Sequence, residues 1–304
     1  MSEQPDGLGD VMEERRRLLS LAYRMMGTLS EAEDVVQETY LRWYRLTEDE
    51  RGDIRNPAAW LTRVASRVAL DALGSARARR ERYVGQWLPE PVPADLFSGT
   101  AAAPVETADP ADRVTLDESV SSALLTVLES MTPAERVAFV LHEVFGLPFG
   151  EIAEIVGRSP AAVRQLASSA RRHVRDHRAV PVTATEHDRT VRAFLAATRS
   201  GDLAGLAQVL APGVELRSDG GGVVSAARNA VHGVDHVARF MLGVLSKQPE
   251  LRFTEVQTAD GLGYRMSLGD HVYGVATFEV DAGRVTDIRL MVNPAKLTSW
   301  LPER

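Results

Sequence analysis

The sequence predicts a chain of several domains, two of them all-helical and the last one α+β. Three observations support this prediction. The 304 residues are enough for two or three domains. Apolar residues recur at three- and four-residue spacing in residues 13–82 and 116–177, whereas strand patterns of period two fill much of the chain after residue 181. Between the two helical parts, residues 87–112 are rich in proline, small residues and acids, as is typical of an extended linker.

Composition excludes several classes of protein. With 44% hydrophobic and 25% charged residues the chain is typical of globular proteins. No apolar run approaches the ~18–20 residues of a membrane span, and the polar residues 1–10 do not have the pattern of a signal peptide. The absence of cysteine excludes disulfides, thiolate zinc sites and cysteine nucleophiles. We therefore expect a cytoplasmic protein without a membrane partner, a bound metal or a cofactor.

Charge is unevenly distributed along the chain. The net charge is −7, which disfavours nucleic-acid binding only if it is spread evenly. Residues 63–82 carry six arginines against two acids, a net charge of +4, and residues 157–178 carry six arginines against one acid, a net charge of +5. These two basic blocks within acidic surroundings are candidate nucleic-acid surfaces.

The first helical part predicts three long helices. The first begins near Glu13 and has an apolar face formed by Leu18, Leu21, Ala22 and Met25. Ser30 and Glu33 predict a capping box at the start of the second helix. Asn56 and Pro57 predict the start of the third, whose apolar side is expected to hold Trp60, Leu61, Val64, Val68 and Leu70.

The second helical part contains a local DNA-binding signal in Phe149–Arg178. Glu151–Gly157 predicts a short helix that ends at a glycine, and Ser159 and Pro160 predict the start of another. A buried stripe of Val163, Leu166, Ala167 and Ala170 would complete a helix-turn-helix, whose second helix enters the major groove. The outward residues would then be Arg158, Ala161, Arg164, Gln165, Ser168, Arg171 and Arg172. Arginine and glutamine can contact base edges, whereas hydroxyls and other arginines hold phosphates; the alternative is a helical hairpin with a solvated arginine face.

The part after Pro181 predicts an α+β domain with a curled antiparallel sheet. Two short helices are expected at about 187–199 and 202–210, and a third near 234–246. Strand patterns lie at Val214–Leu216, Val272–Val280 and Val285–Val292. Turn signals lie at Asp260-Gly261, Gly269-Asp270 and Asp281-Ala282-Gly283.

These parts together resemble an extracytoplasmic-function sigma factor. Residues 13–82 resemble sigma region 2, with Ala32-Glu33-Asp34-Val35-Val36-Gln37-Glu38 in the second helix and Pro57-Ala58-Ala59-Trp60-Leu61 opening the third. Residues 116–178 resemble region 4, with the helix-turn-helix in place. The expected domains are region 2 (10–83), a linker (84–114), region 4 (115–178), a short linker (179–184) and a C-terminal domain (185–304).

The resemblance implies a role for each basic or acidic surface. Core RNA polymerase would bind the acidic second helix, a poor surface for DNA, through Glu33, Asp34, Gln37 and Glu38. Region 2 would melt the promoter −10 element with the third helix and the preceding loop Thr47–Arg55, using Asn56, Trp60, Arg63, Arg67, Arg77 and Arg80. Region 4 would read duplex DNA at the −35 element with Arg158, Ser159, Arg164, Gln165, Ser168, Arg171 and Arg172. Trp60 and Trp43 could instead be core residues, because both lie at helical spacing.

The continuation beyond residue 180 resembles a SnoaL-like domain, a conical α+β barrel that one subgroup of these sigma factors carries. Three motifs mark the subgroup. The first, Trp87-Leu88-Pro89-Glu90-Pro91, is complete. The second, Asp219-Gly220-Gly221-Gly222, is followed by Val223 where lysine is usual. The third, Asn293-Pro294-Ala295-Lys296-Leu297, has Ala295 where aspartate is usual, so any pairing between those two charges is in doubt.

The sequence is compatible with three roles for the C-terminal domain. SnoaL-like barrels include hydrolases and cyclases, and Arg217 and Asp219 would share one face of a strand, so an enzyme fused to a DNA-binding module is the alternative to a sigma factor. A small-molecule ligand in the barrel cavity and a docking surface for regions 2 and 4 are the other two. A one-component repressor, binding operator DNA without polymerase, is a further class. We expect a sigma factor, not an enzyme, whose C-terminal domain modulates activity in cis.

The first motif predicts how that modulation works. A solvated tether gains nothing from Trp87 and Leu88, whereas burying a large apolar side chain contributes about 1.5–3 kcal/mol. Proline lowers the entropy lost when a segment is held extended. We therefore expect residues 87–91 to dock on the C-terminal domain near Asp219–Gly222 and Asn293–Leu297. The alternative is that Trp87 packs against region 2.

Overall fold

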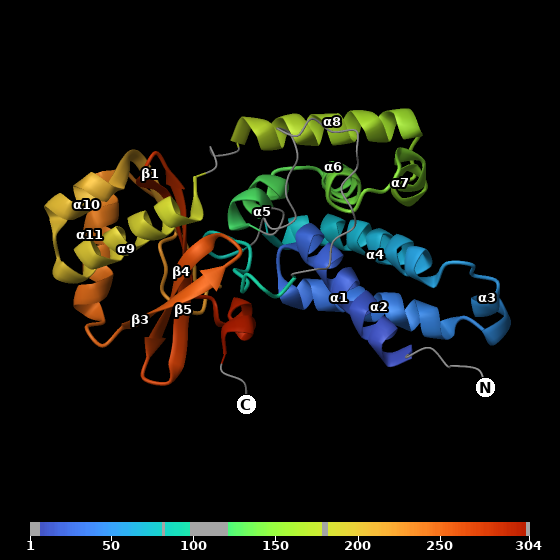
Figure 1. Cartoon of the computed structure of the whole chain (residues 1–304), viewed down its shortest axis with the longest axis horizontal. Coiled ribbons are helices and arrows are strands. Elements are labelled where there is room, and N and C mark those ends of the chain that lie inside the picture. Colours follow the sequence, from blue (N-terminus) through green and yellow to red (C-terminus); the bar gives the residue numbers. More distant parts are fainter. Residues whose placement is uncertain (1–6, 81–82, 98–120, 178–181, 302–304) are drawn as a thin grey trace. The chain divides into compact units, whose positions relative to one another are not determined.

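The computed structural model describes residues 7–80, 83–97, 121–177 and 182–301. They form two compact units. The first contains residues 7–79, Phe97 and Val127–His177, and the second contains Arg80, residues 83–96, Ser121–Thr126 and residues 182–301. The first unit is helical, whereas the second joins the proline-rich segment to a sheet with helices (Figure 1).

The N-terminal half of the first unit consists of α1 (Gly7–Met26), α2 (Leu29–Arg45), α3 (Glu48–Gly52) and α4 (Pro57–Arg80). The predicted face of α1 is buried at Leu18, Leu21, Ala22 and Met25. The predicted start of the second helix is wrong by two residues. Thr28, not Ser30, caps α2, because its hydroxyl oxygen accepts the Glu31 N–H at 3.3 Å. The expected loop Thr47–Arg55 contains α3, which has a capping box between Thr47 and Glu50.

Helix α4 begins as predicted, but its buried stripe differs from the predicted one. The Asn56 side-chain oxygen accepts the Ala59 N–H at 3.0 Å and caps the helix. Trp60, Val64, Val68 and Leu70 are only partly buried. The buried residues are mostly small and follow a four-residue repeat: Leu61, Thr62, Ala65, Ser66, Ala69, Leu73 and Ala76. Small side chains allow close approach of the neighbouring helices, which hydrophobicity alone does not predict.

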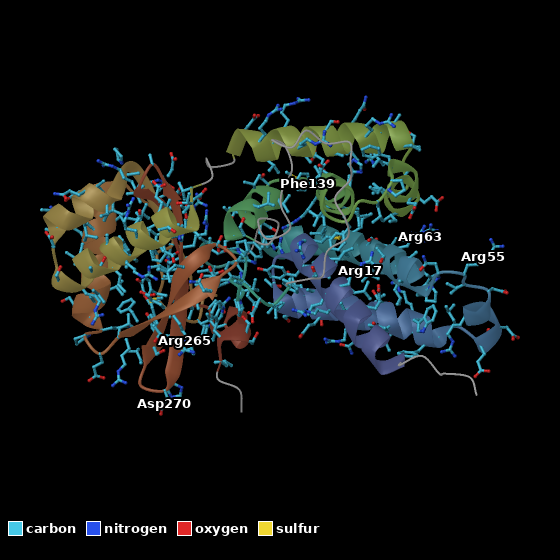
Figure 2. All side chains as sticks on the ribbon, in the orientation of Figure 1. Arg17, Arg55, Arg63, Phe139, Arg265 and Asp270 are labelled. Carbon is cyan, nitrogen blue, oxygen red and sulfur yellow. The ribbon has the colours of Figure 1, made fainter. Side chains whose placement is uncertain are left out.

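The C-terminal half of the first unit contains α5 (Ser122–Glu129), α6 (Pro133–Phe139), the π-helical turn η3 (Val140–Val144), α7 (Phe149–Val156) and α8 (Pro160–His177). The first turn and a half of α5 is assigned to the second unit. Phe139 ends α6 and is buried among the packed helices (Figure 2). The predicted helical residues 116–120 lie outside the described part of the chain.

The second unit has a six-stranded sheet that helices cover on one face. Its elements are α9 (Ala184–Ser200), α10 (Leu203–Val209), β1 (Leu210–Asp219), β2 (Val231–His232), α11 (Val234–Lys247), β3 (Arg252–Thr258), β4 (Gly261–Leu268), β5 (His271–Asp281), β6 (Arg284–Met291) and the short 3-10 turns η4 (Pro294–Lys296) and η5 (Thr298–Trp300). The strand order is β2-β1-β6-β5-β4-β3. The α+β prediction is confirmed, but the sheet is mixed rather than antiparallel, because β1 pairs in parallel with β6.

Residues of α9 and α11 form one core with alternate residues of the strands. Phe194 of α9 lies 5.4 Å, between ring centroids, from Phe278 of β5, and Tyr264 of β4 packs edge-on to the same ring. The opposite face of the sheet has a second, smaller apolar cluster, which contains Leu88 from the proline-rich segment. That second face is where the predicted motifs meet.

Candidate functional site

The helix-turn-helix is present where the sequence predicts it. Gly157 follows α7 with φ +69°, a left-handed conformation that suits glycine, and its N–H donates to the Ala153 carbonyl oxygen at 2.9 Å. The Ser159 hydroxyl oxygen accepts the Ala162 N–H at 3.2 Å and caps α8. Three of the four predicted stripe residues are buried, namely Val163, Ala167 and Ala170, and Leu166 is half-buried.

The outward face of α8 keeps most of the predicted contact residues exposed: Arg158, Ser159, Ala161, Arg164, Gln165, Ser168 and Arg172. Arg171 differs, because its Nε lies 3.2 Å from a carboxylate oxygen of the buried Glu143. The Arg164 guanidinium lies 5.3 Å from the centroid of the ring of Phe149, the first residue of α7, so the first helix of the motif supports its position. A substitution of Arg172 therefore tests phosphate contacts more directly than one of Arg171, which would also break the ion pair with Glu143.

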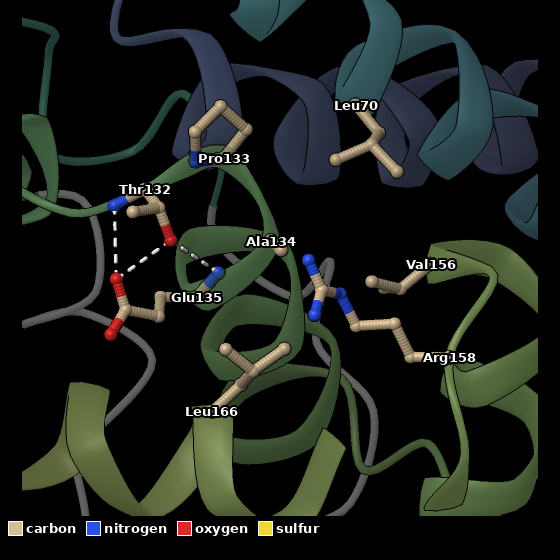
Figure 3. A pocket seen from close by; sticks show the side chains of 8 residues that line it. All are labelled: Leu70, Thr132, Pro133, Ala134, Glu135, Val156, Arg158 and Leu166. Carbon is tan, nitrogen blue, oxygen red and sulfur yellow. Dashed lines mark hydrogen bonds between the residues drawn. The ribbon is translucent and has the colours of Figure 1, made fainter. Parts of the chain in front are cut away.

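Arg158 also lines a cavity of about 460 Å³ at the base of the motif (Figure 3). Leu70 of α4 and Val156 of α7 line the same cavity. On its other side, the Thr132 hydroxyl donates to Glu135 at 2.7 Å in a capping box that starts α6. That bond, together with the Thr132 N–H bond, lowers the pKa of Glu135, so its carboxylate stays charged at neutral pH.

The predicted −10 residues of α4 are already in contact with other groups. Arg63 forms an ion pair with Glu154 of α7 at 3.2 Å, and Arg67 donates to the Glu154 carbonyl oxygen at 3.1 Å. Trp60 packs edge-on against Trp43, with 5.2 Å between ring centroids, and both are half-buried. Asn56 caps α4, and the side chain of Arg77 lies outside the described residues. The arginines therefore contact α7 in this state, and a nucleic acid would have to displace those contacts.

The acidic face of α2 is open to solvent. Glu33, Asp34 and Gln37 are exposed, and Glu38 is half-exposed. Glu38 accepts a hydrogen bond from Arg42, one turn further on, at 2.8 Å. A surface pair of this kind contributes about 0.3–0.5 kcal/mol, so the face is not required for the fold.

The proline-rich segment docks on the C-terminal domain, as predicted. The Asp219 carboxylate is fully buried at the end of β1, and it accepts four hydrogen bonds. Their donors are the Tyr83 hydroxyl at 2.6 Å, the Lys296 ammonium at 2.8 Å and the N–H groups of Gly221 and Leu88 at 2.9 and 3.0 Å. The first and last motifs therefore meet at the aspartate of the second.

Lys296 joins the same three motifs from the C-terminal side. Its Nζ donates to the Leu88 carbonyl oxygen at 2.6 Å and lies 4.2 Å from the centroid of the Trp87 ring. Arg80 covers Trp87 as well, at 3.9 Å from the ring centroid. The half-buried indole therefore lies between two cations within the second unit, and Arg80 belongs to this site rather than to the arginine face of α4.

Apolar contacts complete the docked segment. Leu88 packs with Val275, Met291, Leu297 and Trp300. The Trp300 indole N–H donates to the Pro91 carbonyl oxygen at 2.8 Å. Pro89 and Glu90 are buried, and Pro294 opens the short turn η4.

Glycine is required beside Asn293. A Cβ at Gly221 would lie 2.5 Å from the Asn293 Cγ, and Gly221 has φ +65°. Asn293 in turn donates from Nδ2 to the Tyr83 hydroxyl at 2.8 Å. A Cβ at Gly222 would lie 3.1 Å from the Val84 Cβ, and one at Gly220 would lie within 3.0 Å of the Val224 carbonyl oxygen. The glycines thus let the loop close against the tail.

Sequence reasoning missed Tyr83 and Trp300. Burial raises the pKa of Tyr83, and its hydrogen bond to Asp219 raises it further, so the phenol stays protonated and donates. Their positions could have marked both as candidate site residues, because each aromatic lies within five residues of a motif. Nothing in the sequence shows which distant groups they contact.

Arg217 and Asp219 share a face of β1 as predicted, but they do not form a catalytic pair. Arg217 binds Glu215 at 2.7 Å and Asp287 at 3.3 Å, while Asp219 binds the docked segment. The hydrogen bond between Arg217 and Glu215 raises the pKa of Arg217 and lowers that of Glu215. Glu215 and Arg217 lie on the face of the sheet opposite the α9 and α11 core, because Leu216 between them belongs to that core.

The two departures from the subgroup motifs lie at the surface. Val223 is 79% exposed and Ala295 is exposed. The buried charge pair of the site is Asp219 with Lys296, which involves neither position. The site thus forms without a charge at either residue.

Replacing Trp87 by Ala should loosen the docked segment. The substitution removes two cation–π contacts, each of about 0.5–2 kcal/mol depending on desolvation. We expect faster limited proteolysis of residues 92–112 and a changed transcription yield. Unchanged cleavage together with unchanged transcription would exclude Trp87 from the regulatory mechanism.

Comparison with known proteins assigns each part of the chain. Residues 11–79 match Sigma-70 region 2, residues 121–174 match Sigma-70 region 4, and residues 191–292 match a SnoaL-like domain. This combination defines a sigma factor of RNA polymerase, a class that initiates transcription at promoters. The chain is not expected to be an enzyme, because its similar relatives are sigma factors.

Two relatives of known name match along nearly their whole length. The ECF RNA polymerase sigma factor SigJ of Mycobacterium tuberculosis is 39% identical over 95% of this chain and 93% of the relative. A probable ECF RNA polymerase sigma factor, SigI, from the same organism is 39% identical over 93% of this chain and 92% of the relative. The crystal structure of SigJ matches with a TM-score of 0.71 at 32% identity, covering 98% of this chain and 100% of that one. The chain belongs to the ECF RNA polymerase sigma factors.

Two kinds of feature are absent from the residues that the structure describes. No helix among them has both the length and the apolar content of a membrane span. No group of three or more His, Cys, Asp or Glu side chains there could hold a metal ion.

Proposed function

We propose that this sigma factor reads a −35 element with α8 and a melted −10 element with α4, and that its C-terminal domain modulates both in cis. The observation that supports the proposal most strongly is the exposed arginine and glutamine face of α8 on a correctly capped helix-turn-helix. A helix in that setting enters the major groove, where arginine and glutamine distinguish base pairs.

The acidic face of α2 is proposed to bind core RNA polymerase. Three side chains on this face are exposed, namely Glu33, Asp34 and Gln37. The two carboxylates would repel the phosphates of DNA, whereas they are complementary to a basic protein surface. The single i,i+4 ion pair on that face leaves it free to exchange partners.

Cis modulation is supported by the docked segment. The chain between the two DNA-reading parts passes through the Asp219 site, which holds it by hydrogen bonds, cation–π contacts and apolar packing. A segment fixed in this way limits where the two parts can be placed. A small-molecule ligand in the C-terminal domain stays a prediction.

Base and phosphate contacts of α8 can be separated by mutation. Replacing Arg164 or Gln165 by Ala should cost about 1–3 kcal/mol at one promoter sequence and relax preference at one base pair. Replacing Arg172 by Ala should weaken binding to all sequences alike and reduce the salt dependence. Quantitative binding of duplex −35 DNA by the polymerase-bound factor measures both. If Arg164→Ala changed neither affinity nor preference, the assignment of the recognition face would be wrong.

A one-component repressor would behave differently. It would bind duplex operator tightly as a dimer without polymerase, which a gel-shift assay with the full chain detects. An enzyme would turn over an epoxide or polyketide-like substrate and lose that activity in Asp219→Ala.

A further inference from the structure

The turn between β3 and β4 presents the carboxylate of Asp260, which accepts hydrogen bonds from a residue outside the hairpin. Ala259 and Asp260 form the turn between the paired residues Thr258 and Gly261. The Thr258 hydroxyl accepts the Asp260 N–H at 3.1 Å and donates to the Gly261 carbonyl oxygen at 2.9 Å. Gly261 has φ +95°, which a side chain would strain. These bonds fix the backbone of the turn and so fix where the Asp260 carboxylate lies.

That carboxylate binds the first residue of α5. Asp260 Oδ1 accepts the Ser122 N–H at 2.7 Å, and Oδ2 accepts the Ser122 hydroxyl at 2.7 Å. Ser122 is 3% exposed. The Ser121 hydroxyl already accepts the Leu124 N–H at 3.2 Å, so Asp260 satisfies a different donor at the helix start. A negative charge there is also favoured by the helix dipole.

The same hairpin also binds residues 92–94 of the linker. The Ala259 N–H donates to the Val92 carbonyl oxygen at 3.1 Å, and the Ala94 N–H donates to the Gln257 carbonyl oxygen at 3.1 Å. Pro93 forms a β-bridge with Thr258. Residues 92–94 thus lie along the edge of β3, which is the last strand of the sheet.

Both ends of residues 95–121 therefore meet at one turn. Fully extended, that segment could span roughly 90 Å at ~3.3 Å per residue. While both ends are bound, their separation is that of neighbouring residues of a hairpin. The entropy lost on closing such a loop grows only with the logarithm of its length, so a few hydrogen bonds can maintain it.

We propose that the β3–β4 hairpin is the docking site for residues 92–94 of the linker and for Ser122, and that Asp260 caps the start of α5 from outside that helix. The occupant is the chain's own segment 92–94 and Ser122. By holding Ser122 beside residues 92–94, the hairpin sets how far the start of region 4 can move from that segment. This surface is separate from the Asp219 site, and its effect on transcription rests on the cis modulation proposed above.

Hydrogen exchange of the full chain tests the docking site. Asp260→Ala should raise the exchange of the amides of residues 123–125 by a factor of about 2–30, the range expected for loss of a helix cap. Asp270→Ala is the matched control, because Asp270 occupies the turn of the β4–β5 hairpin at the outer end of the sheet (Figure 2). Asp260 also interacts electrostatically with the buried Arg289, so Asp260→Ala removes that favourable interaction as well.

Ser122→Pro provides the second variant. Proline suits the first position of a helix and removes both donors to Asp260 without touching the hairpin. We expect it to raise exchange in residues 123–125 as Asp260→Ala does, and the double variant to add nothing. If Ser122→Pro exchanged like the wild type, the docking site would be refuted whatever Asp260→Ala does.

The effect on reach is tested by an engineered cross-link. The chain has no cysteine, so Ser122→Cys with Asp260→Cys introduces a single pair. We expect rapid oxidation to a disulfide, with Ser122→Cys plus Asp270→Cys far slower. In run-off transcription the cross-linked factor should show a sharp optimum of −35 to −10 spacing, and Ser122→Pro a broader one. Equal cross-linking rates would overturn the docking site, and equal spacing optima would overturn its control of reach. Loss of transcription by all variants and the wild type would instead refute the proposed function, with the exchange result unaffected.

Discussion

Asp34→Arg combined with Glu38→Arg is expected to abolish association with core RNA polymerase while the fold persists. Asp34 is exposed and Glu38 is half-exposed, and the only described partner of Glu38 is Arg42 one turn away. Reversal should therefore cost the free protein less than about 1 kcal/mol. The complementary basic surface would then face two arginines, and like charges across an interface cost several kcal/mol.

A pull-down of core polymerase with the purified double variant measures this effect. Asp235→Arg with Glu250→Arg is the control, because it makes the same change in net charge at exposed positions of the C-terminal domain. Circular dichroism and thermal unfolding verify the fold of both. Normal recovery of polymerase by the folded Asp34→Arg, Glu38→Arg protein would contradict the assignment of α2.

Lys296→Met is expected to release the docked segment. The substitution leaves the fully buried Asp219 without its cationic partner, and breaking a buried ion pair in this way costs about 3–5 kcal/mol. It also removes the hydrogen bond to the Leu88 carbonyl oxygen and the contact with the Trp87 ring. Denaturant unfolding and limited proteolysis after residue 83 should both show the loss.

The chain supplies a matched control for this variant. Lys247 is its other lysine and lies exposed in the last turn of α11, so Lys247→Met changes the same residue type without burial. We expect wild-type unfolding and proteolysis for the control. If the two variants had equal stability and equal cleavage rates, the Asp219 site would not hold the segment.

Local signals explain which elements could be predicted from the sequence. The helix-turn-helix depends on contacts within a few residues, such as the left-handed Gly157 and the Ser159 cap, and each has a recognisable residue type. The stripe of α4 was mispredicted because hydrophobicity favours Trp60 and Val64, whereas packing buries Ala65 and Ala69.

Distant contacts explain what could not be predicted. The segment at residues 87–91 could be assigned a docking partner because a tryptophan and a leucine beside two prolines imply burial. The Tyr83–Asp219 and Ser122–Asp260 hydrogen bonds join residues 136 and 138 positions apart. Such pairs depend on strand order and on the parallel pairing of β1 with β6, and neither follows from hydrophobic periodicity.

Run-off transcription with core polymerase tests the central claim most directly. The templates would be a pool in which both promoter elements and their spacing are varied, transcribed with the wild type, Lys296→Met or Lys247→Met. We expect the wild type and Lys247→Met to enrich one pair of −35 and −10 sequences at one spacing, and Lys296→Met to use the same sequences over a wider range of spacings. If the transcripts were the same as those of core polymerase alone, the chain would not be a promoter-reading sigma factor. If the two lysine variants had identical spacing profiles, the C-terminal domain would not control the linker.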